Sequence, residues 1–139
     1  MSARPHHPVD YLSAMSLTLP DLQSWLDRYV AAWRSNDAAL IGALFTEDVR
    51  YRYHPGEEPV VGRDAVVASW LESPDDPESW TADYRAWSVT GDHAAATGET
   101  RYADGDHFYN VFVLVFHDGA CAEFTEWFFT EWFVRPREH

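Results

Sequence analysis

Four strand-like segments joined by turn sequences make up the second half of this chain, and they constrain its fold more than any other feature. They span about residues 80–90, 94–103, 107–117 and 120–134. Gly91-Asp92, Asp104-Gly105-Asp106 and Asp118-Gly119 separate them, and such Gly/Asp sequences are typical of hairpin turns. Residues 111–116 are apolar on both faces, which indicates a central strand covered on both sides. The segments therefore predict consecutive antiparallel hairpins.

The first half of the chain has helical periodicity instead. Leu22, Trp25, Tyr29 and Trp33 recur at three- and four-residue spacing, so they share one face of a helix over residues 19–35. Thr18 has the character of an N-cap for that helix. Shorter helices are expected over residues 38–45 and 64–72, and an alternating aromatic and basic strand over 49–53. Helices segregated from hairpin-linked strands predict an α+β fold, with helices on one face of a curved antiparallel sheet.

Length and charge restrict the organisation and the partners. The 139 residues suit one domain, with residues 1–18 as a flexible N-terminal extension and 19–135 as the folded part. A net charge of −13 argues against nucleic acid and against anionic membrane surfaces. No segment has the pattern of a signal peptide or a transmembrane span, so a soluble, cytoplasmic protein is expected.

Cysteine and metal-ligand patterns exclude further classes of protein. The single cysteine rules out an internal disulfide framework and a CxxC site. No His, Asp or Glu set has metal-ligand spacing, and no nucleotide-binding fingerprint occurs, so neither a metal nor a cofactor is expected. Aromatic residues, in contrast, make up 16% of the chain and must either be buried or line a cavity.

Three stretches of the sequence resemble the nuclear transport factor two-like superfamily, and within it the ketosteroid isomerases and the SnoaL-like polyketide cyclases. The stretches are Arg28-Tyr29-Val30-Ala31-Ala32-Trp33, Ala43-Leu44-Phe45-Thr46-Glu47-Asp48 and Gly62-Arg63-Asp64-Ala65. The resemblance covers about residues 20–134. It implies a cone-shaped, curved antiparallel sheet with three N-terminal helices packed on its concave face. That fold serves isomerases, cyclases, dehydratases, epoxide hydrolases and binding modules.

The resemblance to ketosteroid isomerases implies Tyr29 as an oxyanion-stabilising donor, although a core tyrosine with a local hydrogen bond is the alternative. The place of that family's catalytic aspartate falls on Tyr53, or on His54 after a one-residue slip. The place of its second, protonated aspartate falls on Phe112. Because both places lack a carboxylate, authentic ketosteroid isomerase activity is not expected. His54 is then either a base at the mouth of the cone or a surface turn residue.

The resemblance to the cyclases points to Glu126. Those proteins carry the sequence E-H-W-D after a hairpin glycine, and counting from Gly119 places Glu123 and Glu126 on the two acidic positions. Burial among aromatic rings would raise the pKa of Glu126 and make it a usable general base near neutral pH. The alternative is a structural glutamate that is hydrogen-bonded to a tyrosine hydroxyl.

Strand parity predicts what lines the cone. Gly98 and Thr100 are small residues expected to leave room, and Asn110 either orients a ligand carbonyl or caps its strand. A pocket that is mostly aromatic, with few polar groups, suits an apolar small molecule. The predicted substrate-binding residues are Trp33, Tyr51, Tyr53, Trp70, Tyr102, Asn110, Phe112 and Phe128.

The same parity turns Trp127 and Phe129 away from the cone. An apolar outer sheet face of this kind is most simply covered by a second copy of the chain, so a homodimer is expected. The acidic residues of the loop at 73–79 are expected to face water.

Three functions remain open at this stage. The first is a cofactor-independent cyclase, isomerase or dehydratase that acts on an apolar, carbonyl-bearing small molecule. The second is a non-catalytic protein that binds such a molecule, and the third is a dimeric accessory subunit. A catalytic cone requires a second polar group near Glu126, a binding cone leaves Glu126 fully paired, and an accessory subunit has a filled cone.

Overall fold

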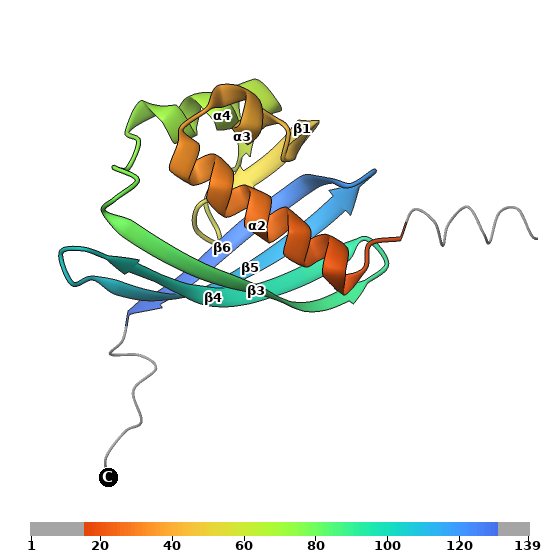
Figure 1. The fold of residues 1–139 in the computed structure, drawn as a ribbon. Coiled ribbons are helices and arrows are strands. Elements are labelled where there is room, and N and C mark those ends of the chain that lie inside the picture. The colour runs from red at the N-terminus through yellow and green to blue at the C-terminus, as the bar shows by residue number, and fades with distance from the viewer. Residues whose placement is uncertain (1–15, 131–139) are drawn as a thin grey trace, which may run out of the picture.

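A computed structural model describes residues 16–130 and shows one curved sheet with helices against its concave side (Figure 1). The expected extension before residue 16 and the last predicted residues, 131–135, lie outside the described part. The elements in chain order are α2 (Leu19–Ser35), α3 (Ala38–Gly42), β1 (Phe45–Arg52), β2 (Val60–Val61), α4 (Arg63–Glu72), β3 (Trp80–Thr90), β4 (His93–Tyr102), β5 (His107–His117) and β6 (Ala120–Thr130).

The sheet has the strand order β2-β1-β6-β5-β4-β3, and the three predicted hairpins from β3 to β6 are present. The α+β class and the curved sheet are therefore confirmed. One pairing differs from an antiparallel sheet, because β1 lies parallel to β6, with Tyr51 beside Phe124. Register shifts interrupt the pairings of β1 with β6, β3 with β4 and β5 with β6, and such irregularities increase the twist that curves a sheet.

Helix α2 begins and ends as its sequence predicts. The Thr18 side chain accepts a hydrogen bond from the Asp21 backbone, and the Asp21 side chain accepts one from the Thr18 backbone, which completes a capping box. Asn36 ends the helix in the left-handed conformation, and Asp37 caps α3. The Gln23 amide then bonds the Tyr84 carbonyl at 2.9 Å, so α2 is attached to the sheet edge at β3.

The second helix and the first strand have different bounds from those predicted. The helix expected over 38–45 ends at Gly42, and β1 already begins at Phe45. The cause is tertiary, since the Leu44 carbonyl accepts hydrogen bonds from the Trp25 indole at 3.0 Å and from the Cys121 backbone at 2.9 Å. Both partners are distant in the chain, so local periodicity did not predict this boundary.

Aromatic side chains fill one part of the space between α2 and the sheet. Phe124 is fully buried, and the rings of Tyr51 and Tyr29 stack on it with centroids 4.4 and 5.6 Å away. Phe112 and Trp25 complete this cluster.

No helix in residues 16–130 is both long and apolar enough to cross a membrane.

Replacing Gly98 by Ala is expected to destabilise the fold by about 1–3 kcal/mol, because the added carbon would overpack the sheet. A Cβ at this position would lie 2.8 Å from the Tyr84 Cα and closer still to the Asp83 carbonyl oxygen. Urea denaturation measures the change. Gly42→Ala is the control, because its Cβ would lie 3.6 Å from the nearest side-chain atoms, and it should not destabilise. Equal stability of the two variants would contradict the argument.

Candidate functional site

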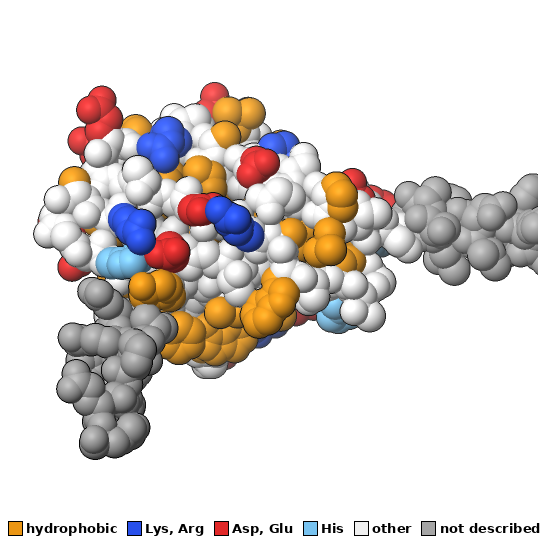
Figure 2. Space-filling model, turned by 60° about the horizontal axis from the view of Figure 1, so that its bottom comes forward, with side chains coloured by type: hydrophobic (Ala, Val, Ile, Leu, Met, Phe, Trp, Pro, Cys, Tyr) orange, Lys and Arg blue, Asp and Glu red, His pale blue; other side chains and the backbone are white. Residues whose placement is uncertain are grey.

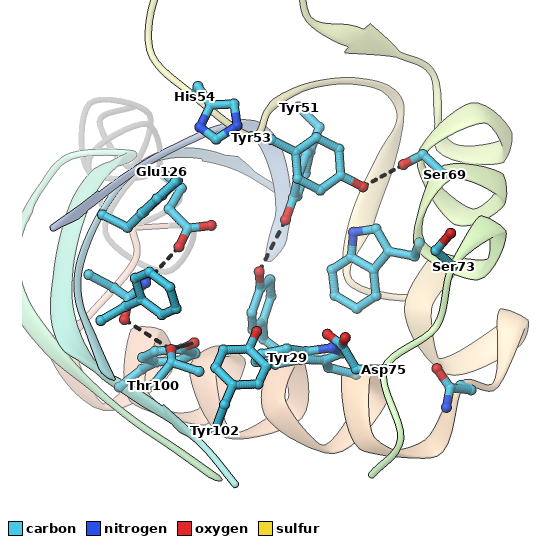
Figure 3. Close-up of a pocket in the computed structure, with 17 residues that line it drawn as sticks. Tyr29, Tyr51, Tyr53, His54, Ser69, Ser73, Asp75, Thr100, Tyr102 and Glu126 are labelled. Carbon is cyan, nitrogen blue, oxygen red and sulfur yellow. Dashed lines mark hydrogen bonds between the residues drawn. The ribbon is translucent and has the colours of Figure 1, made fainter. Parts of the chain in front are cut away.

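The wider part of the cone is a cavity of about 430 Å³ between α2, α4 and the sheet (Figure 3). Aromatic rings form most of its wall. All the predicted site residues except Phe112 line the cavity. They are Tyr29, Trp33, Tyr51, Tyr53, His54, Trp70, Tyr102, Asn110, Glu126 and Phe128. These residues enclose an open cavity, whereas an accessory subunit was expected to have a filled cone.

Two predictions about the wall need correction. Phe112 does not line the cavity, because it is fully buried against Tyr84 and Phe124, with ring centroids 4.8 and 5.1 Å away. Gly98 does not leave room for a ligand. The Tyr84 ring and backbone occupy the space beside it, so the missing side chain serves close packing between β3 and β4.

Glu126 is the central polar group of the cavity. Its Oε2 accepts a hydrogen bond from Asn110 Nδ2 at 2.7 Å, and Oε1 accepts none from residues 16–130. Burial raises the pKa of this carboxyl from 4.5 to about 7, and the Asn110 hydrogen bond acts in the opposite direction. Figure 3 shows the carboxyl group directed into the cavity from the sheet side. Glu126 therefore changes its charge near neutral pH with one oxygen held and one oxygen free.

A chain of hydrogen bonds across four strands positions this carboxyl. Thr100 on β4 donates to Asn110 Oδ1 on β5 at 2.9 Å, so the Thr100 oxygen is left to accept. The Tyr84 hydroxyl on β3 lies 2.6 Å from that oxygen and must donate to it. The amide of Asn110 consequently turns its nitrogen toward Glu126 on β6. The strand-capping role considered for Asn110 is thus replaced by orientation of the glutamate.

Tyr29 and Tyr51 form a second polar group in the cavity. Their hydroxyl oxygens lie 3.0 Å apart, and both side chains are buried. Burial raises the pKa of each phenol well above 10, and the Glu126 charge adds to the shift, so both remain protonated. One hydrogen bond between two hydroxyls uses one of the two protons. Among residues 16–130 no acceptor takes the other proton, which leaves it for a ligand.

Tyr53 and His54 have different surroundings. Ser69 Oγ donates to the Val66 carbonyl at 3.0 Å, so Tyr53, 2.6 Å from that oxygen, donates to Ser69. The Tyr53 hydroxyl is therefore engaged by the protein. His54 is an exposed residue that follows β1, with its ring 5.2 Å from that of Phe128. It lies at the mouth of the cavity and has no hydrogen bond to Glu126.

Several lining residues were missed by the sequence analysis. Tyr84 and Phe108 point inward on β3 and β5, and strand parity was sufficient to find them. Asn36, Ser73 and Asp75 come from the ends of helices and from a loop, where no periodicity applies. Asp75 contradicts the expectation that the acidic loop faces only water. Residues 16–130 contain no cluster of His, Cys, Asp or Glu that could hold a metal ion.

Sequence comparison identifies the family. Residues 26–124 match the family of SnoaL-like domains, and the chain belongs to that family. No protein with a curated description matches it significantly.

Solved structures share the fold at low sequence identity. A putative ketosteroid isomerase from Kribbella flavida DSM 17836 is 21% identical, with a TM-score of 0.67 over 87% of this chain and 85% of that one. An NTF-2 like protein of unknown function from Burkholderia xenovorans LB400 is 19% identical, with a TM-score of 0.63 over 78% and 83%. An LEH-like epoxide hydrolase from M. tuberculosis is 12% identical, with a TM-score of 0.59 over 80% and 84%. At these identities the likeness establishes the nuclear transport factor two-like fold.

Replacing Glu126 by Gln is expected to stabilise the protein above pH 7 and to have little effect below pH 4.5. The folded protein binds this proton more tightly than the unfolded chain, because the folded-state pKa is the higher one. The stability from this group is therefore full below about pH 4.5 and is lost as the pH rises to the folded-state pKa of about 7, by roughly 3 kcal/mol.

Urea denaturation at both pH values tests this prediction. Glu123→Gln is the control, since Glu123 is exposed on the same strand, and it should change the stability little at either pH. A destabilised Glu126→Gln protein above pH 7 would show that the carboxylate holds the fold together.

Proposed function

We propose that this protein binds an apolar, carbonyl-bearing small molecule in the cone and catalyses proton transfer on it without a cofactor. The observation that carries the proposal is Glu126, whose pKa is raised to about 7 and whose Oε1 is free and directed into an aromatic cavity. A carboxylate with such a pKa is suited to general base catalysis near neutral pH.

The proposed step is removal of a proton from the carbon next to the carbonyl group. Glu126 Oε1 takes the proton, the C–H electron pair forms a carbon–carbon double bond, and the carbonyl oxygen becomes an enolate oxygen. The unused proton of the Tyr29–Tyr51 pair would donate to that oxygen. Isomerisation, cyclisation and dehydration share this step, and they differ in whether the carbanion is reprotonated, attacks a second carbonyl carbon or expels a hydroxyl group.

The hydrogen-bond chain from Tyr84 supports a catalytic role over a purely structural glutamate. A structural glutamate is satisfied by the protein on both oxygens, whereas here Asn110 holds only Oε2. The chain contains no lysine, so a lysine imine with the carbonyl is excluded as an alternative mechanism. If Glu126 only binds its ligand, the cavity would still take up carbonyl compounds, but no proton would exchange.

Deuterium exchange into 2-tetralone tests the proposal without the natural substrate. Its acidic protons lie next to a carbonyl on a bicyclic aromatic frame, and NMR in D₂O follows their loss. We expect the parent protein to accelerate the exchange as the pH rises through 7, as Glu126 ionises. Glu126→Gln should slow the exchange by about a hundredfold or more, because the general base is lost.

Binding measured by thermal shift accompanies the exchange assay. Glu126→Gln should bind 2-tetralone nearly as well as the parent protein, because the aromatic walls remain. Binding by both proteins without accelerated exchange would favour the non-catalytic binding protein. Exchange that is equal in the two proteins would eliminate Glu126 as the base.

The outer sheet face supports a second proposal, that two copies of the chain pair through it. Figure 2 shows hydrophobic side chains gathered in a band on this side of the molecule. The exposed large hydrophobic residues on the outward side of the strands include Trp87, Val113 and Phe129. Trp127 on β6 is paired with Val111 on β5. An apolar face of this kind is costly to leave in water, and a symmetric dimer buries it twice.

Replacing Val113 by Glu is expected to convert the dimer into a monomer, because a charge would be buried in the centre of the contact. Light scattering after gel filtration should fall from twice the 16.0 kDa chain mass to that mass. Leu40→Glu is the control, since Leu40 is 51% exposed on α3, away from the sheet face. A parent protein that is monomeric, or a Val113→Glu protein that is still dimeric, would refute this interface.

A further inference from the structure

We infer that the cavity selects carbonyl compounds that also carry an ammonium group, and that Asp75 at the rim binds that group. The inference rests on the proposed function and names its substrate class. It is drawn from the charges around the cavity, the setting of Asp75 and the aromatic rings near it.

The charges that line the cavity are almost all of one sign. Two carboxylate residues line it, Glu126 and Asp75, and among residues 16–130 His54 is the only basic side chain in the lining. The chain has ten arginines and no lysine, and its formal net charge is −13. An anionic ligand would meet repulsion both in the cavity and on approach, whereas a cation would be attracted.

Asp75 has no hydrogen-bond or ion-pair partner for its side chain within the described part of the chain. It is half-buried and lines the cavity. Its neighbour Asp76 is used differently, because its Oδ1 accepts from the Glu78 backbone at 2.9 Å and closes a turn. Of these two adjacent carboxylates, Asp76 stabilises the loop itself and Asp75 lines the cavity.

The loop that carries Asp75 is anchored at several points. Arg34 donates to the Pro77 carbonyl at 2.6 Å, and the Ala103 backbone donates to the Ser79 carbonyl at 2.7 Å. The Arg34 guanidinium also lies 4.1 Å from the centre of the Trp80 ring. The contacts of Arg34 are thus with the Pro77 carbonyl and the Trp80 ring rather than with the Asp75 carboxylate, and they hold the loop that carries Asp75 in place.

Aromatic rings surround the same end of the cavity. Figure 3 shows Asp75 and Tyr102 together, across the cavity from Glu126 and His54. Burial raises the pKa of Tyr102 to about 12, and the Asp75 charge is close enough to add to that shift. Trp33 also lines the cavity, with its ring stacked at 3.6 Å on Trp80. A carboxylate beside Trp and Tyr rings is the chemistry that recognises alkylammonium ions.

The two ends of the cavity then have separate tasks. Glu126 and the Tyr29–Tyr51 pair act on the carbonyl end of the ligand, and Asp75 with Tyr102 and Trp33 holds the cationic end. The ammonium group stays away from the base, so it does not compete for the Glu126 carboxylate. Charge at the rim thus orients the molecule, which the apolar walls alone would not do.

A matched set of three acetylnaphthalenes tests the inference. Each carries one group on the ring remote from the acetyl group: a trimethylammoniomethyl group, the neutral neopentyl group of the same shape, or an anionic carboxymethyl group. Isothermal titration measures binding to the parent protein and to Asp75→Asn. Asp76→Asn is the control, because it removes the same charge from the adjacent residue of the same loop.

We expect the parent protein and Asp76→Asn to bind the cation about tenfold more tightly than the neopentyl compound, and the anion more weakly than both. Asp75→Asn should lose most of that preference while binding the neopentyl compound unchanged. The inference would be overturned if the parent protein bound the cation and the neopentyl compound equally well. It would also be overturned if the preference for the cation survived in Asp75→Asn and disappeared in Glu126→Gln. Neither result would contradict the proposed function. If none of the three compounds binds, the proposed function fails, and the inference fails with it.

Discussion

The hydrogen bond from Asn110 to Glu126 is the interaction on which the rest of the site depends. It joins β5 to β6 on the concave face and determines which glutamate oxygen is held and which is free. Its direction follows from Thr100 and Tyr84, each on the next strand of the sheet. Close packing of β3 on Gly98 in turn allows Tyr84 to reach Thr100. The absence of a side chain at Gly98 thus contributes, through Tyr84, Thr100 and Asn110, to the orientation of the Glu126 carboxyl group.

Burial decides the electrostatics around that group. The same desolvation that raises the pKa of Glu126 to about 7 keeps the phenols of Tyr29 and Tyr51 protonated. The site therefore combines a base that ionises near neutral pH with a donor that does not ionise there. The partly desolvated acid costs stability at higher pH, and the stacked rings of Tyr51, Tyr29 and Phe124 are among the contacts that offset this cost. A carboxylate retained at such a cost is typical of a functional site rather than of a structural core.

Much of the fold could be predicted because its signals are local. The N-cap at Thr18, the end of α2 at Ser35 and the hairpin turns from β3 to β6 each depend on a few adjacent residues. Strand parity placed Glu126 and Asn110 on one face of the sheet, and the resemblance to the cyclases indicated that this face is the inward one. The parallel pairing of β1 with β6 could not be predicted in this way, since it joins segments that are far apart in the chain. The early start of β1 at Phe45 has the same cause, because distant partners engage Leu44.

The sequence by itself determined the order of the main helices and strands, the parity of the strands and the net negative charge, because each is a property of neighbouring residues or of composition. Only the tertiary structure decided which polar groups are left free. Strand parity cannot tell that Phe112 is covered by Tyr84 and Phe124 or that Gly98 accommodates Tyr84. It also cannot tell that an acidic surface loop, held by Arg34, turns Asp75 to the cavity. Such outcomes depend on contacts between distant segments, and these contacts exist only once the chain has folded.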